Sequence, residues 1–366
     1  MSHLLVPPAY DGGSLVDVVT ELEGRLTGIG RRERGLRPEL AALIPPARTY
    51  VIVVFDGLGA AQLDHARAAD LRRDLRATVD AMFPTTTTVS LASVATGLPP
   101  AGHGLLGYQL WLPEVGQVVN TIKWTTLWGD PLPVATAGFL PVPNTWERLT
   151  AAGIESITVQ PANFAGTPLT TALYRGCRFE PVGGVAEAVE ATIQLAEAPG
   201  RLILTYLPQV DFAAHVHGQA SKEYGAALGT VATAWSRLRE GVPRDAVLVG
   251  TADHGHVDIP VHRRYRLPKE LQADRILYGD SRVMFVLGDP IDDDAMPATW
   301  RPFADMSSWW GPPPKHEAFD ERRPSGALIA DAGHALLHRY SDARLVGHHG
   351  GLTTAERTVP LLVAGG

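Results

Sequence analysis

Runs of apolar, β-branched residues alternate along the chain with stretches that have a helical pattern. Thr49–Phe55 reads TYVIVVF, which is typical of a strand buried on both faces of a parallel sheet. Similar runs predict strands over 156–160, 202–207, 246–250 and 359–364. Helical patterns cover 60–69, 89–95, 144–152, 184–196 and 224–239. The alternation predicts an α/β fold, a doubly wound and mostly parallel sheet with helices on both faces.

Residues 261–345 interrupt this rhythm. They contain proline and tryptophan clusters and one further strand pattern, RVMFVLG, and the main pattern returns at Gly347. A length of 366 residues fits about two domains, or one large α/β domain with an insertion. We expect a single domain over 1–366 in which 261–345 forms an inserted cap or lid subdomain.

Composition narrows the class of protein. Apolar residues make up 45% and charged residues 19%, as in ordinary globular proteins. The formal net charge of −7 argues against a basic surface for duplex nucleic acid. Because the chain has neither a signal-peptide pattern nor an apolar run of membrane-spanning length, the default expectation is a soluble, cytoplasmic protein without a membrane partner. The oligomeric state is left open.

Carboxylates and histidines follow the predicted strands. In an open α/β sheet, ligands bind at the carboxyl ends of the strands, so these residues are expected at one edge. Each of them alone is ordinary, because an aspartate after a strand is usually a helix cap or a turn residue. Together they suit zinc, with manganese or iron as alternatives, and they are enough for two metals with three ligands each. Six residues form this set: Asp56, Asp211, His215, Asp253, His254 and His349.

A run of threonines follows Phe83-Pro84 and precedes the helical pattern at 89–95. A hydroxyl at a helix N-terminus lies where backbone N–H groups favour phosphate, and a nearby metal can activate it as a nucleophile. The alternative is that the run only caps the helix. The residues themselves do not distinguish which threonine reacts.

Taken in order, these motifs resemble the alkaline phosphatase superfamily, and most closely its type I phosphodiesterase/nucleotide pyrophosphatase family. The resemblance covers nearly the whole chain outside 261–345 and is carried by VVFDGLG, FPTTT, VATGLPPAGHGLLG, YLPQVDFAAHVHG, TADHG and GHHG. It implies two zinc ions. Asp211, His215 and His349 would hold one ion. Asp56, Asp253 and His254 would hold the other, with the nucleophile Thr87 at its open position.

The chain departs from the family pattern near the phosphate. Relatives carry an asparagine shortly after the His-Gly pair, and Tyr108 stands at the matching position here. Tyr108, Asn120 and Lys123 are the candidate substrate-binding replacements, because each can donate a hydrogen bond to an oxyanion. The extra histidines His103, His217, His256 and His348 are expected to support the ligands or to be structural.

The function implied by the resemblance is metal-dependent hydrolysis of phosphodiester or nucleotide pyrophosphate bonds through a covalent phosphothreonine on Thr87. The substrate would be a small phosphoester or nucleotide. A phosphomonoesterase or phosphonate hydrolase on the same scaffold is the alternative, and a metal-binding pseudoenzyme is a more remote one. Several aromatic residues could stack on the substrate or belong to the core: Tyr108, Trp111, Trp124, Trp128 and Phe164.

Overall fold

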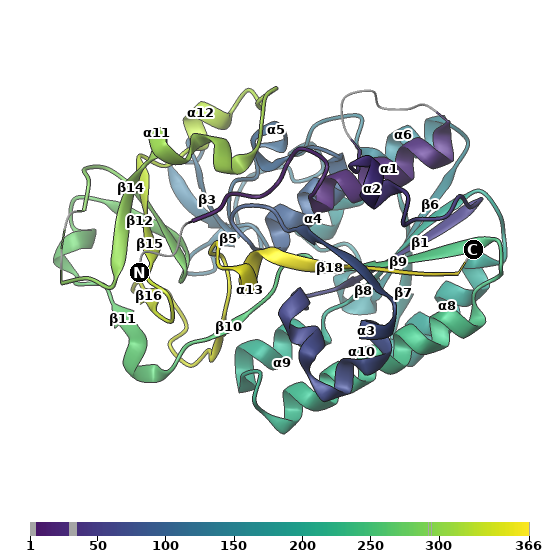
Figure 1. Ribbon diagram of the computed structural model, residues 1–366. Helices are drawn as coiled ribbons and strands as arrows, with labels where there is room; N and C mark the ends of the chain where they lie inside the picture. Colours follow the sequence, from purple (N-terminus) through teal and green to yellow (C-terminus); the bar gives the residue numbers. More distant parts are fainter. Residues whose placement is uncertain (1–4, 29–34, 292, 294, 366) are drawn as a thin grey trace.

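A seven-stranded sheet forms the centre of the molecule in the computed structural model, which describes residues 5–28, 35–291, 293 and 295–365 (Figure 1). The strand order is β2-β18-β9-β1-β8-β6-β7. The strands are β1 (Thr49–Phe55), β2 (Leu75–Asp80), β6 (Glu155–Pro161), β7 (Arg178–Val182), β8 (Arg201–Leu207), β9 (Ala246–Thr251) and β18 (Thr358–Gly365). All seven residues of β1 are buried, as its apolar run predicts. The expected doubly wound, mostly parallel α/β fold is confirmed.

Two features of this sheet differ from the expectation. The last strand, β18, runs antiparallel to both of its neighbours, β9 and β2. The edge strand β2 was not expected at all, since its first four residues alternate between half-buried and exposed and it contains no long apolar run. Only the pairing with β18 makes this segment a strand.

Helices cover both faces of the sheet (Figure 1). One group contains α1 (Leu15–Thr27), α4 (Thr87–Thr96) and α6 (Thr145–Ala151), and the other contains α3 (Ala69–Arg73), α8 (Val185–Ala196), α9 (Gln209–His217) and α10 (Lys222–Gly241). The expected helix over 60–69 is wrong. That segment forms two 3₁₀ turns, Ala60–Asp64 and Ala66–Ala68, because the backbone of His65 between them is extended.

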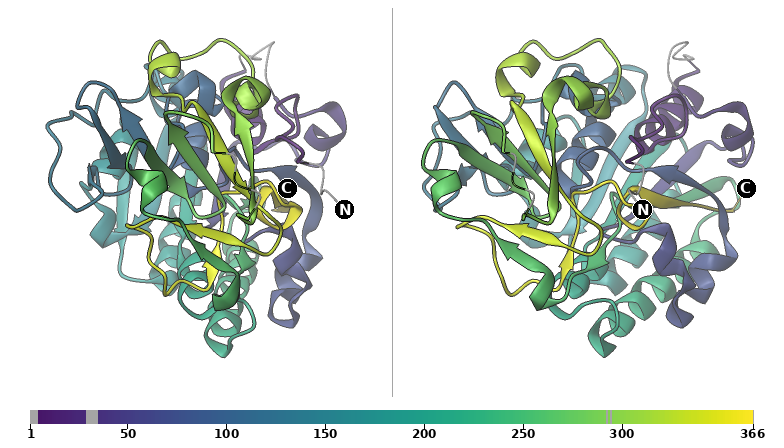
Figure 2. Two further views of the ribbon diagram at one scale, coloured as in Figure 1. Left: turned by 90° about the vertical axis from the view of Figure 1, so that its left-hand side faces the viewer. Right: turned by 60° about the vertical axis from the view of Figure 1, so that its left-hand side comes forward.

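Smaller sheets lie beside the main one (Figure 2). Residues 261–345 contain a four-stranded antiparallel sheet of order β12-β13-β15-β14, from β12 (Ile276–Asp280), β13 (Val283–Leu287), β14 (Ala298–Pro302) and β15 (Gly326–Ala330). They also contain the pair β11 (Arg264–Arg266) and β16 (Ala335–Leu337). An unexpected three-stranded sheet, β3 (Gln109–Leu112), β4 (Gln117–Asn120) and β5 (Thr125–Thr126), contacts β12 through the hydrogen bond from Gly279 N to Gln109 Oε1, 2.9 Å long. That 261–345 is a separate lid subdomain stays a prediction.

Short elements complete the chain. The pair β10 (Val257–Asp258) and β17 (Gly347–His348) leads into and out of the inserted region. The short helices are α2 (Pro38–Ala41), α5 (Pro100–His103), α7 (Pro168–Leu173), α11 (Phe303–Met306), α12 (Phe319–Arg322) and α13 (Thr354–Arg357). Within the described ranges, the chain has no helix of the length and apolarity needed to cross a bilayer.

Candidate active site

Three neighbouring strands of the main sheet deliver the aspartates. Asp56 follows β1 directly, Asp211 lies in the first turn of α9 after β8, and Asp253 lies two residues beyond β9. The sharp turn after β1 requires Gly57, whose φ is +73° and whose missing Cβ would lie 2.9 Å from the Cα of Asp211. Its backbone N–H donates to Asp253 Oδ1 over 3.0 Å. The three carboxylates thus meet at the carboxyl edge of the sheet.

The three predicted histidine ligands are oriented in the same way. Each ring donates from Nδ1 to a backbone carbonyl: His215 to Gly347 at 2.8 Å, His254 to Gly255 at 3.1 Å and His349 to Thr85 at 2.8 Å. A carbonyl oxygen only accepts, so in the neutral ring the lone pair is on Nε2. The Nε2 atoms of His215 and His349 lie 3.1 Å apart. Two lone pairs facing each other at this distance suit a cation bound by both rings.

Burial distinguishes one threonine of the run from the other three. Thr85, Thr86 and Thr88 are buried, whereas Thr87, the first residue of α4, is half-buried. The hydroxyl of Thr87 lies 3.2 Å from Nε2 of His254 and 3.5 Å from Oδ1 of Asp56. Thr87 is therefore the residue of this run whose hydroxyl lies among the carboxylates and histidines.

Charge crowding characterises the site. Burial, together with the charges of Asp211 and Asp253, raises the pKa of Asp56 well above its usual range. Burial alone would raise the pKa of Asp211 too, but the imidazoles of His215 and His256 outweigh it and the pKa falls well below its usual range. Burial and the neighbouring His254 lower the pKa of His349. Buried carboxylates beside imidazoles are the donor set that divalent metal ions bind.

Two groups of ligand atoms are close enough to hold an ion. Asp56, Asp253 and His254 form one, and Asp211, His254, His256 and His349 form the other, with all ligand atoms of a group within 4.8 Å of one another. The first matches the set inferred from the resemblance. The second differs from the inferred set, because it contains His254 and His256 and not His215. His215 lies beside it, with Nε2 3.4 Å from Asp211 Oδ1.

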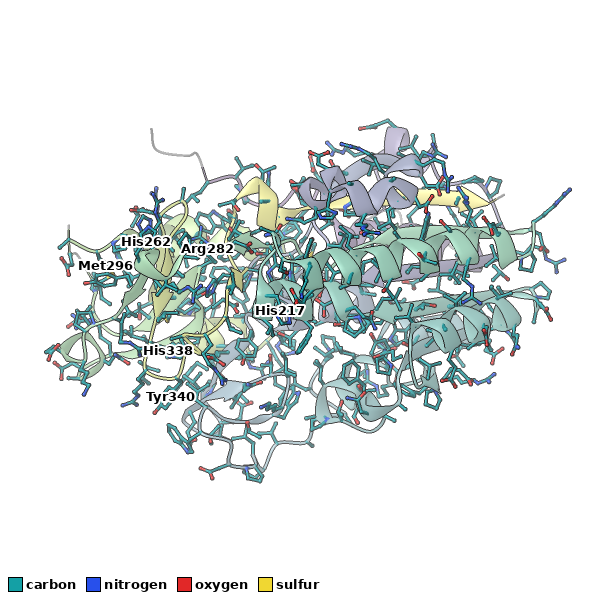
Figure 3. All side chains as sticks on the ribbon, turned by 90° about the horizontal axis from the view of Figure 1, so that it is seen from below. His217, His262, Arg282, Met296, His338 and Tyr340 are labelled. Carbon is teal, nitrogen blue, oxygen red and sulfur yellow. The ribbon has the colours of Figure 1, made fainter. Side chains whose placement is uncertain are left out.

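The four extra histidines occupy different places. His256 donates from Nε2 to Asp211 Oδ1 over 2.7 Å, and His348 is bonded to the hydroxyl of Ser281. His103 bonds Ser93 at 3.0 Å in the core between α4 and α5. His217 is exposed at the end of α9 (Figure 3). Only His256 and His348 therefore lie beside the predicted ligands. Their signal in the sequence is adjacency: His256 follows His254 by two positions and His348 precedes His349.

Two of the predicted substrate-binding residues, Tyr108 and Asn120, are bonded to each other. Asn120 donates from Nδ2 to the Tyr108 hydroxyl over 2.9 Å, and its Oδ1 accepts from the backbone N–H groups of Ile122 and Lys123. Both ends of the Asn120 amide are therefore used within the protein. Because its oxygen accepts this bond, the Tyr108 hydroxyl keeps its own proton to donate elsewhere. Burial and the charge of Asp280 raise the pKa of Tyr108 to about 12, so that proton stays in place at neutral pH.

Two cavities meet at Thr87. The first, here named the Asp280 cavity, has a volume of about 350 Å³. Its lining includes Thr87, Tyr108, Asp211, His215, Asp280, Tyr340, Asp342, His348 and His349. The second, named the Phe164 cavity, has a volume of about 610 Å³. It is lined by Asp56, Thr87, Leu91, Lys123, Phe164, Leu169, Tyr174, Tyr206, Asp211 and Phe212, among others.

The aromatic residues divide between cavity and core. Phe164 lines the second cavity, 6.3 Å from the ring of Tyr206. Trp124 is buried against Phe139 and belongs to the core. Trp128 is 60% exposed and packs on Tyr340 at the edge of the molecule.

An α/β sheet with a threonine at a helix start, facing aspartates and histidines at the carboxyl edge, defines the alkaline phosphatase class of fold. A model of the family described as type I phosphodiesterase/nucleotide pyrophosphatase matches residues 50–273. The chain belongs to this family, and it is a phosphoric ester hydrolase. The matched range contains Thr87 and every predicted ligand except His349.

Solved structures share the fold at low identity. Murine ectonucleotide pyrophosphatase/phosphodiesterase 5 is 18% identical, with a TM-score of 0.64 over 87% of this chain and 88% of that one. An inactive form of the murine protein, in complex with AMP, gives the same score and identity over 86% and 87%. Phosphonoacetate hydrolase from Sinorhizobium meliloti, in complex with phosphonoacetate, is 18% identical with a TM-score of 0.63 over 87% and 91%. No curated protein matches the chain in sequence.

Proposed function

We propose that the protein is a metal-dependent phosphodiesterase or nucleotide pyrophosphatase that uses Thr87 as its nucleophile. One observation carries this proposal: the Thr87 hydroxyl lies beside His254 and Asp56 and lines two cavities at once. A diester has a substituent on each side of its phosphorus, so two cavities meeting at one hydroxyl suit a diester better than a monoester.

The donor set fits two divalent ions. Asp211, His215 and His349 would hold one, and Asp56, Asp253 and His254 the other. Mixed nitrogen and oxygen ligands favour zinc, with manganese or iron as alternatives. When bound, such ions lower the pKa of a nearby hydroxyl or water and stabilise the charge on a leaving oxygen.

Residues of the chain position the nucleophile and the phosphate. The Oγ1 of Thr87 loses its proton to water and attacks phosphorus, and the P–O bond to the leaving group breaks on the opposite side. The leaving oxygen takes up a proton, and water then hydrolyses the substituted phosphothreonine and returns a proton to Oγ1. Helix α4 holds the nucleophile in place, because the Ser90 hydroxyl donates to the carbonyl of Asp253 over 2.7 Å. The Tyr108 hydroxyl, oriented by Asn120, donates to a phosphoryl oxygen where relatives use asparagine.

The Phe164 cavity would take the larger and more apolar substituent. Its aromatic and aliphatic lining suits a nucleobase or another aromatic group, and the exposed Lys123 at its edge can pair with the phosphate. We keep the cytoplasmic location as a prediction.

The test uses the Thr87→Ala variant and three substrates. Wild-type protein loaded with zinc should hydrolyse bis-p-nitrophenyl phosphate faster than p-nitrophenyl phosphate or phosphonoacetate. Thr87→Ala should lose turnover while elemental analysis finds the metal content unchanged. Activity retained in Thr87→Ala would refute the nucleophile. Preference for the monoester or for phosphonoacetate would favour the corresponding hydrolase on the same scaffold, for which the phosphonoacetate hydrolase structure is the precedent in fold.

A further inference from the structure

A surface groove runs along helix α10. Helix α8 and the 3₁₀ turn Ala66–Ala68 border it, and both pack against α10 (Figure 1). The groove, here named the α10 groove, has a volume of about 830 Å³. It shares no lining residue with the two cavities that meet at Thr87. It therefore belongs to a different part of the surface from the candidate active site.

Small residues form the floor of the α10 groove. The hydroxyls of Thr230 and Thr233 donate to the carbonyls of Ala226 and Gly229 over 3.0 and 2.9 Å, so their protons are used within the helix. A floor without long side chains lets another backbone come close to α10. The floor residues of α10 lie on one face of the helix: Gly225, Ala226, Gly229, Thr230, Thr233 and Ala234.

Gly229 is not required by the internal packing of this chain. It lies inside α10, where glycine is a poor helix former. An added Cβ would come no closer than 3.9 Å to a neighbouring side chain, at the Cδ of Arg67. Gly241 on the same helix is different, because an added Cβ there would lie 2.3 Å from Ile193 Cδ1. A glycine that weakens its helix without serving an internal contact indicates close approach from outside.

The α10 groove is basic, although the chain has a net charge of −7. Arg67, Lys222 and Arg237 line it, and no aspartate or glutamate among the described residues does. Arg67 is exposed and forms no ion pair within the described ranges. Lys222 and Arg237 have only exposed partners, Glu223 at 3.9 Å and Glu190 at 3.4 Å, and such pairs are weak. The groove therefore keeps its positive charge for an anionic partner.

The three cations are spread along the groove. Lys222 and Arg237 are separated by about 22 Å along α10, and the Arg67 side chain lies near Gly229 between them. A small anion cannot reach both ends, whereas an elongated partner can. Because the backbone groups of α8 and α10 are bonded within their own helices, the groove offers an extended peptide no backbone hydrogen bonds. A helical partner needs none, since its own backbone groups are already bonded.

We propose that the α10 groove binds an acidic amphipathic helix of a partner protein. The apolar face of that helix packs on the small residues of α10, and its carboxylates pair with Arg67, Lys222 and Arg237. Gly229 marks the point of closest approach. This interaction goes beyond the hydrolysis proposed for Thr87 and does not depend on it.

The test uses synthetic peptides of about 18 residues, which span about 27 Å as helices. The acidic peptide has alanine and leucine along one face and glutamate on both flanks. In the basic peptide lysine replaces every glutamate, and in a third a central proline interrupts the acidic helix. Fluorescence anisotropy measures binding to the full-length protein. The acidic peptide should bind saturably and about tenfold more tightly than the other two. If it does not bind, or if the proline peptide binds equally well, the proposal is overturned.

Charge reversal in the groove should exchange the preference between the acidic and basic peptides. Arg67→Glu/Lys222→Glu should weaken binding of the acidic peptide about tenfold and strengthen binding of the basic one. Arg263→Glu/Lys269→Glu is the matched control, because both residues are exposed and neither lines the groove. Equal effects of the two double variants would show that only the net charge matters, which contradicts the proposal.

The variant Gly229→Gln separates docking from a role in the fold. Glutamine is a good helix former and its side chain fills the groove, so the unfolding midpoint should stay or rise while binding weakens about tenfold. Thr150→Gln, at an exposed position of α6, should change neither. Unchanged binding to Gly229→Gln would refute the docking site. Sedimentation tests the other occupant: self-association of wild-type protein that Gly229→Gln abolishes would assign the groove to a second copy and overturn the proposal.

Discussion

The buried ion pair between Arg282 and Glu356 links the inserted region to the loop that carries His349. Glu356 is fully buried, and Arg282 is 2% exposed. The Glu356 carboxylate accepts from Arg282 Nε at 3.3 Å, from Gly351 N at 2.9 Å and from the Thr353 hydroxyl at 2.6 Å. Because Gly351 is two residues from His349, this carboxylate also holds the ligand loop.

We expect Glu356→Gln to lower the free energy of unfolding by about 3 kcal/mol. Breaking a buried ion pair by removing one partner costs about 3–5 kcal/mol, because the other charge remains buried. The amide oxygen of glutamine can keep the bond from Gly351, and its NH2 group can donate to the Thr353 hydroxyl oxygen. Arg282 keeps its bonds to the carbonyls of Asp331 and His334. The loss should therefore lie at the lower end of that range.

Urea unfolding of the metal-free proteins measures this loss, since the midpoint shifts while the slope stays constant. The control is a double-mutant cycle with Arg282→Met. If the charge pair is responsible, Glu356→Gln/Arg282→Met should lose less than the sum of the single losses. Additive losses, or a single loss below about 1 kcal/mol, as for an exposed pair, would refute the reasoning.

Three further predictions concern the site. Tyr108→Phe should lower kcat about 100- to 1,000-fold with little change in stability, because one oxyanion donor is removed; stopped assays on bis-p-nitrophenyl phosphate measure it. Asp280→Asn should gain thermal stability relative to wild type as pH rises from about 4 to about 8. Across this window the unfolded wild type loses the Asp280 proton, whereas the folded wild type retains it because its pKa is raised. The rising pH therefore favours the unfolded state, and the stability of the wild type falls. His215→Ala should lose one metal equivalent by elemental analysis, whereas His256→Ala should keep both with about 10- to 100-fold weaker affinity, because His256 Nε2 is occupied by Asp211.

How much the sequence reveals depends on the kind of interaction. The strand β1 was predicted to the residue because a run buried on both faces has one strong pattern. The helix α6 was placed within one residue at each end because Asn144 and Glu147 form a local capping box. The strands β2 and β3 were missed because their structure depends on pairing with segments far along the chain, which no local pattern records.

The same contrast between local patterns and long-range contacts applies to the site. The strand ends brought together Asp56, Asp211 and Asp253, because parallel strands share one carboxyl edge. The role of Asn120 could not be read from the sequence, since only the folded hairpin shows that its amide is bonded to Tyr108. His256 was considered only as a supporting or structural residue, and its bond to Asp211 depends on how two loops approach each other.

The charge around Thr87 connects these observations. A phosphodiester is an anion, and Lys123 is the only lysine or arginine among the described residues that lines either cavity. Without bound cations the substrate would meet the carboxylates of Asp56 and Asp211 and be repelled. In the proposed mechanism the divalent ions would therefore act twice: besides activating Thr87, they would turn a negatively charged site into one that accepts an anion. It follows that partial loss of metal should raise KM as well as lower kcat, whereas loss of the Thr87 hydroxyl should affect kcat alone.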